Sequence, residues 1–163
     1  MKTNFYRGLI RLNAFVFLFL LIMPGCLNEH LPMSLFVNHY ISEYEKAYNT
    51  HNPDTMMPFF MENADIIMGN EPKLNGNSDI ISWWKDYFQN LEPERMGKFT
   101  LDSFRRLSSN VILINVNFSS GGINSSGEEL PTRLARGTWV IVKIKNRWKI
   151  SAIRGQPAEG DMR

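Results

Sequence analysis

The chain has 163 residues, with 18 lysines and arginines against 16 aspartates and glutamates, and a formal charge of +2. This length fits a single domain, and the near-neutral balance gives no sign of the basic footprint that nucleic-acid-binding proteins carry. The single cysteine excludes an intramolecular disulfide bond.

Residues 1–25 have the pattern of an export signal. Three basic residues precede an apolar run, AFVFLFLLIM at 14–23, which the dipeptide Pro24-Gly25 ends. The run is about half the roughly 20 residues that a membrane-spanning helix needs, so a transmembrane anchor is the weaker alternative. Removal of this segment changes the formal charge from +2 to −1.

Cys26, directly after this signal, is a candidate for lipidation. The tetrad Met23-Pro24-Gly25-Cys26 resembles a bacterial lipobox, which is cut before a cysteine that becomes lipidated; Met23 and Pro24 depart from the usual pattern. The resemblance implies attachment to a membrane through lipid on Cys26. Leu27 in the next position implies an outer-membrane lipoprotein of the bacterial cell envelope, facing the periplasm. The alternative is an ordinary cleavage site beside an incidental thiol.

The mature chain starts with a short tether, residues 26–32, followed by three predicted helices. Apolar residues at three- and four-residue spacing predict amphipathic helices over 34–50 and 79–91. Between them, Asn52 suits an N-cap and Pro53 the first helical position, so a short helix is expected to start here.

Apolar residues that alternate along the chain predict strands. One strand is expected before the last helix and four after it, over 64–68, 99–107, 111–118, 133–145 and 148–154. Glycine and serine predict a long loop over 119–131, and Asn146-Arg147 predicts a tight hairpin. Helices first and antiparallel strands last indicate an α+β fold with helices on one face of the sheet.

The alternation also assigns a face to each strand residue. Lys143 shares a face with Trp139 and Ile141, and we expect that face in solvent. Arg136 and Thr138 are then expected to point inward, at one end of an apolar row.

An inward arginine needs a partner, because arginine is rarely buried alone. One interpretation is a pocket in which Arg136, with Arg154, meets an anionic or carbonyl-bearing ligand. The other is a salt bridge at the end of the sheet, with Glu62, Asp65 or Asp79 as the acid.

Four segments, in this order and spacing, resemble the nuclear transport factor 2-like superfamily near its SnoaL-like and ketosteroid-isomerase-like branches. They are YNTHNPD at 48–54, FMENAD at 60–65, the loop and helix start at 69–81, and the closing hairpin at 136–150. The resemblance implies a cone-shaped domain over 33–157, in which a curved antiparallel sheet wraps around three N-terminal helices, with 158–163 as a tail.

The resemblance also implies a hydrophobic cavity. We expect a small hydrophobic ligand there, or an anionic one because of Arg136, and no cofactor. The expected ligand-binding residues are Tyr44, Phe59, Met68, Trp84, Phe88, Arg136, Thr138 and Arg154. Ketosteroid isomerases carry an aspartate base late in the first strand, where this chain has Met68, whose thioether cannot take up a proton. We therefore expect no catalytic residue, and the scattered histidines predict no metal site.

Two alternatives stay open beside a non-catalytic binding domain. One is a SnoaL-like isomerase, cyclase or hydrolase of a small hydrophobic carbonyl compound that uses a water or a tyrosine instead of the missing acid. The other is an interaction module that forms a homodimer through the outer sheet face, where Val111, Leu113, Trp139 and Ile141 are expected.

Overall fold

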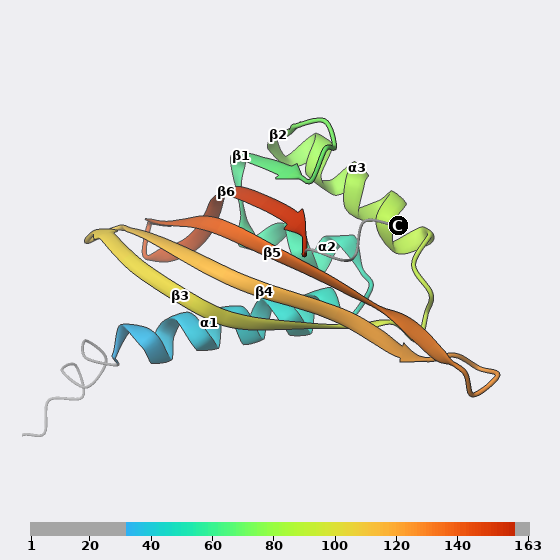
Figure 1. Ribbon diagram of the computed structural model, residues 1–163. Helices are drawn as coiled ribbons and strands as arrows, with labels where there is room; N and C mark the ends of the chain where they lie inside the picture. The colour runs from blue at the N-terminus through green and yellow to red at the C-terminus, as the bar shows by residue number, and fades with distance from the viewer. Residues whose placement is uncertain (1–31, 159–163) are drawn as a thin grey trace, which may run out of the picture. The chain divides into compact units, whose positions relative to one another are not determined.

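A computed structural model describes residues 32–158 of the chain (Figure 1). Residues 31–163 form one compact unit. The expected export signal, Cys26 and the C-terminal tail after Ala158 lie outside the described residues, so the expectations about them stay predictions. None of the helices in the described part is long and apolar enough to cross a bilayer.

The helices form where the sequence predicts them: α1 (Met33–Tyr48), α2 (Pro53–Met56), the 3-10 helix η1 (Met57–Phe59) and α3 (Gly76–Gln89). The Asn52 side chain accepts the Asp54 N–H at 3.0 Å and Pro53 follows it, which confirms the expected start of α2. At the start of α3, the Asp79 carboxylate accepts the Asn75 N–H at 3.0 Å and so satisfies a free backbone donor.

The strands are β1 (Phe60–Met68), β2 (Leu74–Asn75), β3 (Met96–Ser108), β4 (Val111–Ile123), β5 (Glu129–Ile144) and β6 (Arg147–Pro157). They form one sheet in the order β2-β1-β6-β5-β4-β3, in which β1 and β6 are parallel and the other neighbours antiparallel. Figure 1 shows the curved sheet with α1 across one face, which confirms the α+β fold.

The expected loop over 119–131 is wrong, because β4 and β5 remain paired as far as Ile123 and Glu129. Glycine is needed in this strand for a close approach and does not mark a turn. A side chain at Gly122 would place its Cβ against the backbone carbonyl oxygen of Glu94.

Strand pairing shows that β5 turns the opposite face inward from the one expected. Ile112 and Ile114 of β4 are fully buried and pair with Ile141 and Trp139. Because paired residues share a face, Trp139 and Ile141 point to the helices, where they are 4% and 0% exposed. Their expected place on the outer face is wrong. Lys143 lies on the same face and suggested that this face is in solvent. Lys143 is next to the last residue of β5, however, where the strand is no longer buried.

A β-bulge at Ser151 reverses the expected phase of β6, since the register against β5 shifts there by one residue. As a result Ile150 and Ile153 are both buried, although strict alternation would place them on opposite faces. Arg154 is exposed on the outer face. Strict alternation would place Arg154 on the same face as Ile150, and it fails here because alternation holds only within a strand that has no bulge.

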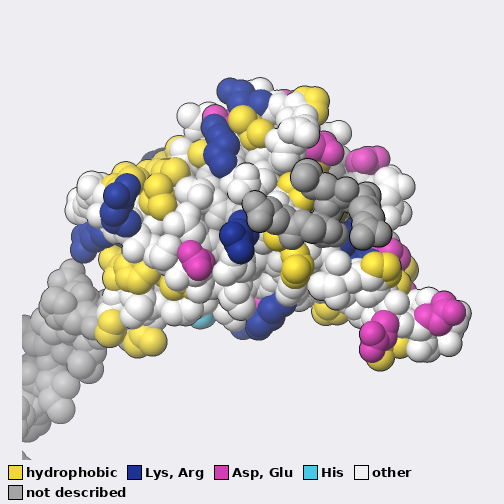
Figure 2. All heavy atoms as spheres, in the orientation of Figure 1, with side chains coloured by type: hydrophobic (Ala, Val, Ile, Leu, Met, Phe, Trp, Pro, Cys, Tyr) yellow, Lys and Arg dark blue, Asp and Glu magenta, His cyan; other side chains and the backbone are white. Residues whose placement is uncertain are grey.

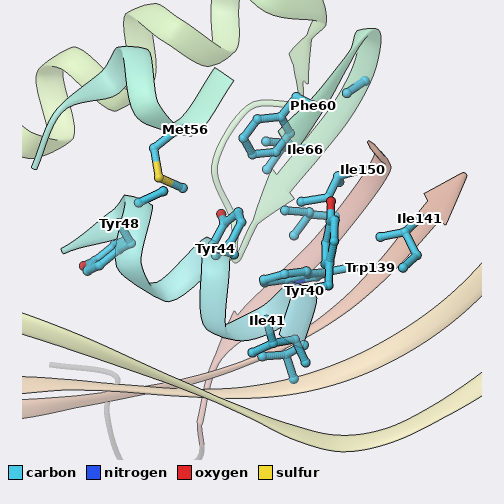
Figure 3. Packing of buried hydrophobic residues seen from close by; sticks show 14 of the residues in the cluster. Tyr40, Ile41, Tyr44, Tyr48, Met56, Phe60, Ile66, Trp139, Ile141 and Ile150 are labelled. Carbon is cyan, nitrogen blue, oxygen red and sulfur yellow. The ribbon is translucent and has the colours of Figure 1, made fainter. Parts of the chain in front are cut away.

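The core between α1 and the sheet is built on three tyrosines, Tyr40, Tyr44 and Tyr48, on one side of the helix (Figure 3). The Tyr44 ring lies 4.6 Å from Trp139 and 5.2 Å from Phe99, and the Tyr48 ring lies 5.3 Å from Phe99. Aromatic pairs of this kind contribute about 0.5–1.5 kcal/mol each beyond their burial. They hold α1 against both β5 and the edge strand β3.

Polar side chains of α1 cover the free edge of β3. The Asn49 side chain donates to the Gly97 carbonyl at 2.9 Å and accepts the Gly97 N–H at 2.7 Å. The Glu45 carboxylate accepts the Phe99 N–H at 2.7 Å. These bonds satisfy backbone groups that an edge strand leaves unpaired, and they bring Gly97 against Tyr48.

We expect Gly97→Ala to lower the free energy of unfolding by roughly 1–3 kcal/mol, because the added Cβ would lie 2.5 Å from Tyr48 Cε1. Urea denaturation followed by circular dichroism measures the change. Gly121→Ala is the matched control, since a Cβ there meets nothing closer than 3.8 Å. Equal losses in the two variants would contradict the close approach of β3 to Tyr48.

Candidate functional site

An apolar cavity of about 160 Å³ lies between α1, α3 and the inner face of the sheet. Aromatic and aliphatic side chains and the backbone of β5 and β6 surround it: Tyr44, Tyr48, Ile66, Met68, Trp83, Trp84, Tyr87, Phe99, Val116, Phe118, Ala135, Arg136, Gly137, Trp139, Ile153 and Gly155. An apolar cavity of roughly 150 Å³ is known to hold one benzene molecule. The space therefore fits a single ring or a short chain.

Trp84 of α3 provides an unused hydrogen-bond donor in this wall. Its side chain lines the cavity and is 5% exposed. The buried indole Nε1–H has no hydrogen-bond partner among the described residues. A buried donor without an acceptor costs about 1–3 kcal/mol, so a bound molecule whose acceptor atom reached this N–H would be favoured.

Three tyrosines add neutral hydroxyl groups. The hydroxyls of Tyr48 and Tyr87 lie 2.6 Å apart, and Tyr44 also lines the cavity. Burial raises the pKa values of Tyr44 and Tyr48 well above the usual range of a phenol. Both therefore stay protonated near neutral pH, where they can donate hydrogen bonds but cannot act as general bases.

Among the described residues, those that line the cavity include no aspartate, glutamate or histidine. Met68 lies where the family resemblance expects the base, and its sulfur packs over the backbone of Gly155. Nor does the described part of the chain bring three histidine, cysteine or acidic side chains close enough together to hold a metal ion. The cavity offers hydrogen-bond donors without a carboxylate or imidazole to accept a proton.

Of the apolar residues expected in the pocket, Tyr44, Met68 and Trp84 line the cavity, and Phe59 and Phe88 lie behind its walls. The Phe59 ring is 5.3 Å from the Tyr44 ring, and Phe88 stacks on Trp84 at 5.0 Å. These two rings support lining residues without facing the cavity.

The expectation missed Trp83, Tyr87, Phe118 and Trp139, which also line the cavity. Trp83 and Tyr87 stack at 5.0 Å with 11° between their planes. Their spacing of one helical turn was a usable signal. Trp139 gave no such signal, because its face depends on the register of β5.

The expected inward orientation of Arg136 and Thr138 is wrong, and Arg154, which was expected to join Arg136 in the pocket, lies on the outer face with them. Arg136 borders the cavity from its place in β5, but its side chain is exposed. Together with Thr138 and Arg154 it lines a polar hollow of about 500 Å³ on the outer face. The Thr138 hydroxyl donates there to the Asn115 side chain at 2.8 Å. The cavity therefore contains no guanidinium group for an anionic ligand.

Asp65, one of the acids considered for Arg136, binds Arg154 instead, with 2.7 Å between Nη1 and Oδ1. The hydrogen bond from Arg154 is the main reason that the pKa of Asp65 is lowered. The side chains are 30% and 47% exposed, so the pair contributes about 0–1 kcal/mol. It belongs to the polar surface of the sheet.

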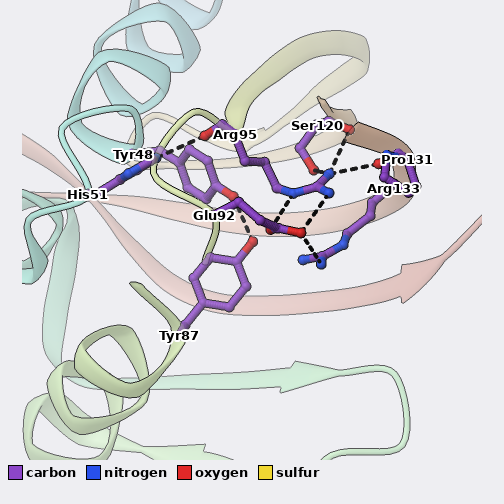
Figure 4. Close-up of polar contacts among 8 residues, drawn as sticks. All are labelled: Tyr48, His51, Tyr87, Glu92, Arg95, Ser120, Pro131 and Arg133. Carbon is purple, nitrogen blue, oxygen red and sulfur yellow. Dashed lines mark hydrogen bonds and ion pairs between the residues drawn. The ribbon is translucent and has the colours of Figure 1, made fainter. Parts of the chain in front are cut away.

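Arg95, in the segment between α3 and β3, is the one buried cation of the described residues, at 1% exposure (Figure 4). Its guanidinium donates to the Glu92 carboxylate at 2.8 Å, to the Pro131 carbonyl at 2.8 Å and to the Ser120 carbonyl at 3.3 Å. Nε2 of His51 lies 2.9 Å from the Arg95 carbonyl oxygen. This network joins the segment to the β4–β5 hairpin, and no periodic pattern in the sequence announces it.

We expect Glu92→Gln to destabilise the protein by about 1–3 kcal/mol at pH 7. The hydrogen bond from Arg95 lowers the pKa of Glu92 from 4.5 to about 2. Because the folded-state pKa is the lower one, the stabilisation is complete above about pH 4.5 and is lost as the pH falls toward 2.

Urea denaturation of wild type and Glu92→Gln between pH 3 and pH 7 measures this dependence. The difference between them should shrink as the pH falls. Glu43→Gln, which removes an exposed pair with Lys46, is the control and should change stability little. A difference that stays constant with pH would contradict the role of the Glu92 charge.

Comparison with known proteins agrees with this architecture. A model of the SnoaL-like domain family matches residues 37–155. A domain of unknown function with a cystatin-like fold from Nostoc punctiforme PCC 73102 is 17% identical, with 77% of this chain and 76% of that chain covered and a TM-score of 0.65. No curated protein matches the chain.

Two further solved structures show the same fold. A ketosteroid isomerase-like protein from Erwinia carotovora atroseptica SCRI1043 is 9% identical, covers 79% of this chain and 99% of its own, and has a TM-score of 0.64. An NTF-2 like protein of unknown function from Shewanella oneidensis MR-1 is 19% identical, with 77% and 99% coverage and a TM-score of 0.63. At these identities the likeness shows the fold alone.

Proposed function

The chain belongs to the SnoaL-like domain family, and we propose that it is a non-catalytic domain that binds one small, mostly apolar molecule carrying a hydrogen-bond acceptor. The observation that carries the proposal is the buried Trp84 N–H, which has no partner among the described residues and belongs to a residue that lines an apolar cavity.

The chemistry of the cavity favours a neutral ligand. A carbonyl or ether oxygen would satisfy the Trp84 donor and could also accept from the Tyr44 hydroxyl, while a ring or short chain would fill the apolar remainder. Arg136 is exposed on the outer face, so nothing in the cavity would balance an anionic ligand. Of the two ligand classes expected from the sequence, the hydrophobic one is therefore favoured.

An isomerase, cyclase or hydrolase is the weaker alternative. General-base chemistry needs a group that takes up a proton near neutral pH. The described lining residues include the Met68 thioether and tyrosines, of which burial keeps Tyr44 and Tyr48 protonated, but no carboxylate or imidazole. The name of the ketosteroid isomerase-like relative describes that protein, which is 9% identical to this chain.

Acetophenone and ethylbenzene test the role of Trp84, because they share size and shape and differ in the carbonyl oxygen. We expect the protein to bind acetophenone roughly five- to tenfold more tightly, the effect of one hydrogen bond of about 1–1.5 kcal/mol. Calorimetric titration measures both affinities. Chemical-shift change of the Trp84 indole N–H in the acetophenone complex identifies the donor.

Trp84→Phe should bring the two affinities together, because it removes the donor and keeps an aromatic wall. Trp83→Phe, which changes a neighbouring lining residue, should retain the preference. Equal affinities in the wild type, or a preference that survives in Trp84→Phe, would contradict the proposed contact. Failure of both compounds to bind would contradict the ligand class.

Export and membrane attachment are a second proposal, supported by the sequence of residues 1–26. We propose that the protein is a lipoprotein of the bacterial cell envelope, in the outer membrane and facing the periplasm, with lipid on Cys26. Cys26→Ser should lose the lipid mass and leave the membrane fraction, whereas Asn28→Ser should keep both. Intact mass spectrometry and fractionation measure this, and a lipid-free mass for the wild type would count against it.

A homodimer through the outer sheet face also stays a proposal. Trp139 and Ile141 cannot contribute to it, because both are buried under the helices. Val111 and Leu113 lie on the outer face beside their cross-strand partners in β5, and all are half-buried. These apolar side chains are what supports an interface at this place.

A further inference from the structure

We propose that the end of the domain at which α1 begins lies against an anionic phospholipid surface. We call this part the basic end. It is made of the first turns of α1, the β3–β4 turn and the β5–β6 turn with the strand ends beside them, and it carries Arg105, Arg106, Lys143, Lys145, Arg147 and Lys149.

Contacts between the three segments show that they lie together. The Phe36 ring of α1 is 5.3 Å from the Trp148 ring of β6, and Trp148 pairs with Lys143 across the β5–β6 hairpin. The Lys143 N–H donates to the Asn110 carbonyl of the β3–β4 turn at 2.8 Å. Figure 1 shows both turns at the same end of the sheet as the start of α1.

The basic end has no acidic residue to balance its six cations. Residues 33–42, 103–113 and 139–153 contain neither aspartate nor glutamate. None of the six side chains is in an ion pair with a described residue, whereas six other lysines and arginines of the described part are. Arg106 and Lys149 donate to backbone carbonyls instead. The positive charge therefore remains available to a partner.

The start of α1 adds to this positive potential. Its first turn has no acidic residue, and its N-cap, Pro32, forms no side-chain hydrogen bond. The positive end of the helix dipole thus faces the same region as the cations.

Each of the three segments also exposes one large aliphatic side chain. Leu35 of α1 is 53% exposed, Leu107 before the β3–β4 turn 49% and Ile144 before the β5–β6 turn 39%. Figure 2 shows hydrophobic side chains beside lysine and arginine at this end. Cations next to exposed aliphatic groups suit the boundary between phospholipid headgroups and acyl chains.

The length of the tether fits the same partner. Residues 27–31 separate Cys26 from Pro32, where the described chain enters α1. Fully extended, this stretch spans at most roughly 20 Å. Lipid on Cys26 would thus hold the basic end near the bilayer. Only the effect of the tether depends on the proposed lipidation. The cations and the exposed aliphatic side chains are present whether or not Cys26 carries lipid.

A lipid surface fits these observations better than a nucleic acid. The charge of residues 26–163 is −1, so the protein is not basic as a whole and the cations are concentrated at one end. The attraction between such a cluster and an anionic surface acts over about a Debye length, roughly 10 Å. The short tether permits the basic end to come that close to the bilayer. The exposed aliphatic side chains would have no apolar group to contact in the phosphate backbone of a nucleic acid.

Vesicle co-sedimentation tests the proposal with residues 27–163, which retain the whole compact unit of 31–163 and lack the lipidated cysteine. We expect binding to phosphatidylcholine vesicles that contain phosphatidylglycerol, little binding to phosphatidylcholine alone, and weakening by salt. Each lysine or arginine near an anionic surface strengthens binding roughly fivefold. Partitioning should therefore fall roughly several hundredfold in the basic-end variant R105Q/R106Q/K145Q/R147Q.

The variant K46Q/K85Q/K98Q/R136Q is the matched control, because it removes the same charge from other parts of the surface and should keep most of the binding. Circular dichroism verifies that both variants are folded. Equal losses in the two variants, unchanged binding in the basic-end variant, or tighter binding to duplex DNA than to the vesicles would overturn the proposal. None of these outcomes bears on the cavity or on Cys26.

Discussion

The packing of the Tyr44 ring against Trp139 and Phe99, at 4.6 and 5.2 Å, holds α1 across the inner face of the sheet. With α1 in this place, the inner residues of β4 and β5 are buried and the charged residues of β5 and β6 are left outside. Because Tyr44 and Trp139 also line the cavity, the contact that stabilises the fold also shapes the site. The cavity is the space that these rings and those of α3 leave unfilled.

This arrangement separates two kinds of chemistry. Neutral donors, the Trp84 indole and the tyrosine hydroxyls, line the cavity, where burial would make an uncompensated charge costly. Arg95, the one buried cation of the described residues, is paired with the Glu92 carboxylate, and the other lysines and arginines of that part are exposed or half-buried at the surface. A neutral ligand inside and a charged partner outside are therefore compatible roles for one small domain.

The sequence could predict the elements but not all of their faces. Periodic apolar residues located α1, α3 and the strands, because that signal is local to each segment. It failed at β6, where the bulge at Ser151 reverses the alternation, and at β5, where Lys143 lies at the end of an otherwise buried face. Although Glu92 lies only three residues away, the burial of Arg95 could not be predicted, since its other partners, Ser120 and Pro131, come from distant segments that only the fold brings together.

By itself, the sequence determined the order of the helices and of the five long strands, because residue types and their spacing along one stretch of chain carry that signal. Through the family resemblance it also placed Met68, a residue without acid–base chemistry, at the expected base position. Only the tertiary structure decided that Arg136 lies outside, that Trp139 lies inside, and that six cations from separate segments gather where α1 begins. These outcomes depend on strand register and on contacts between residues far apart in the chain, which no local pattern encodes.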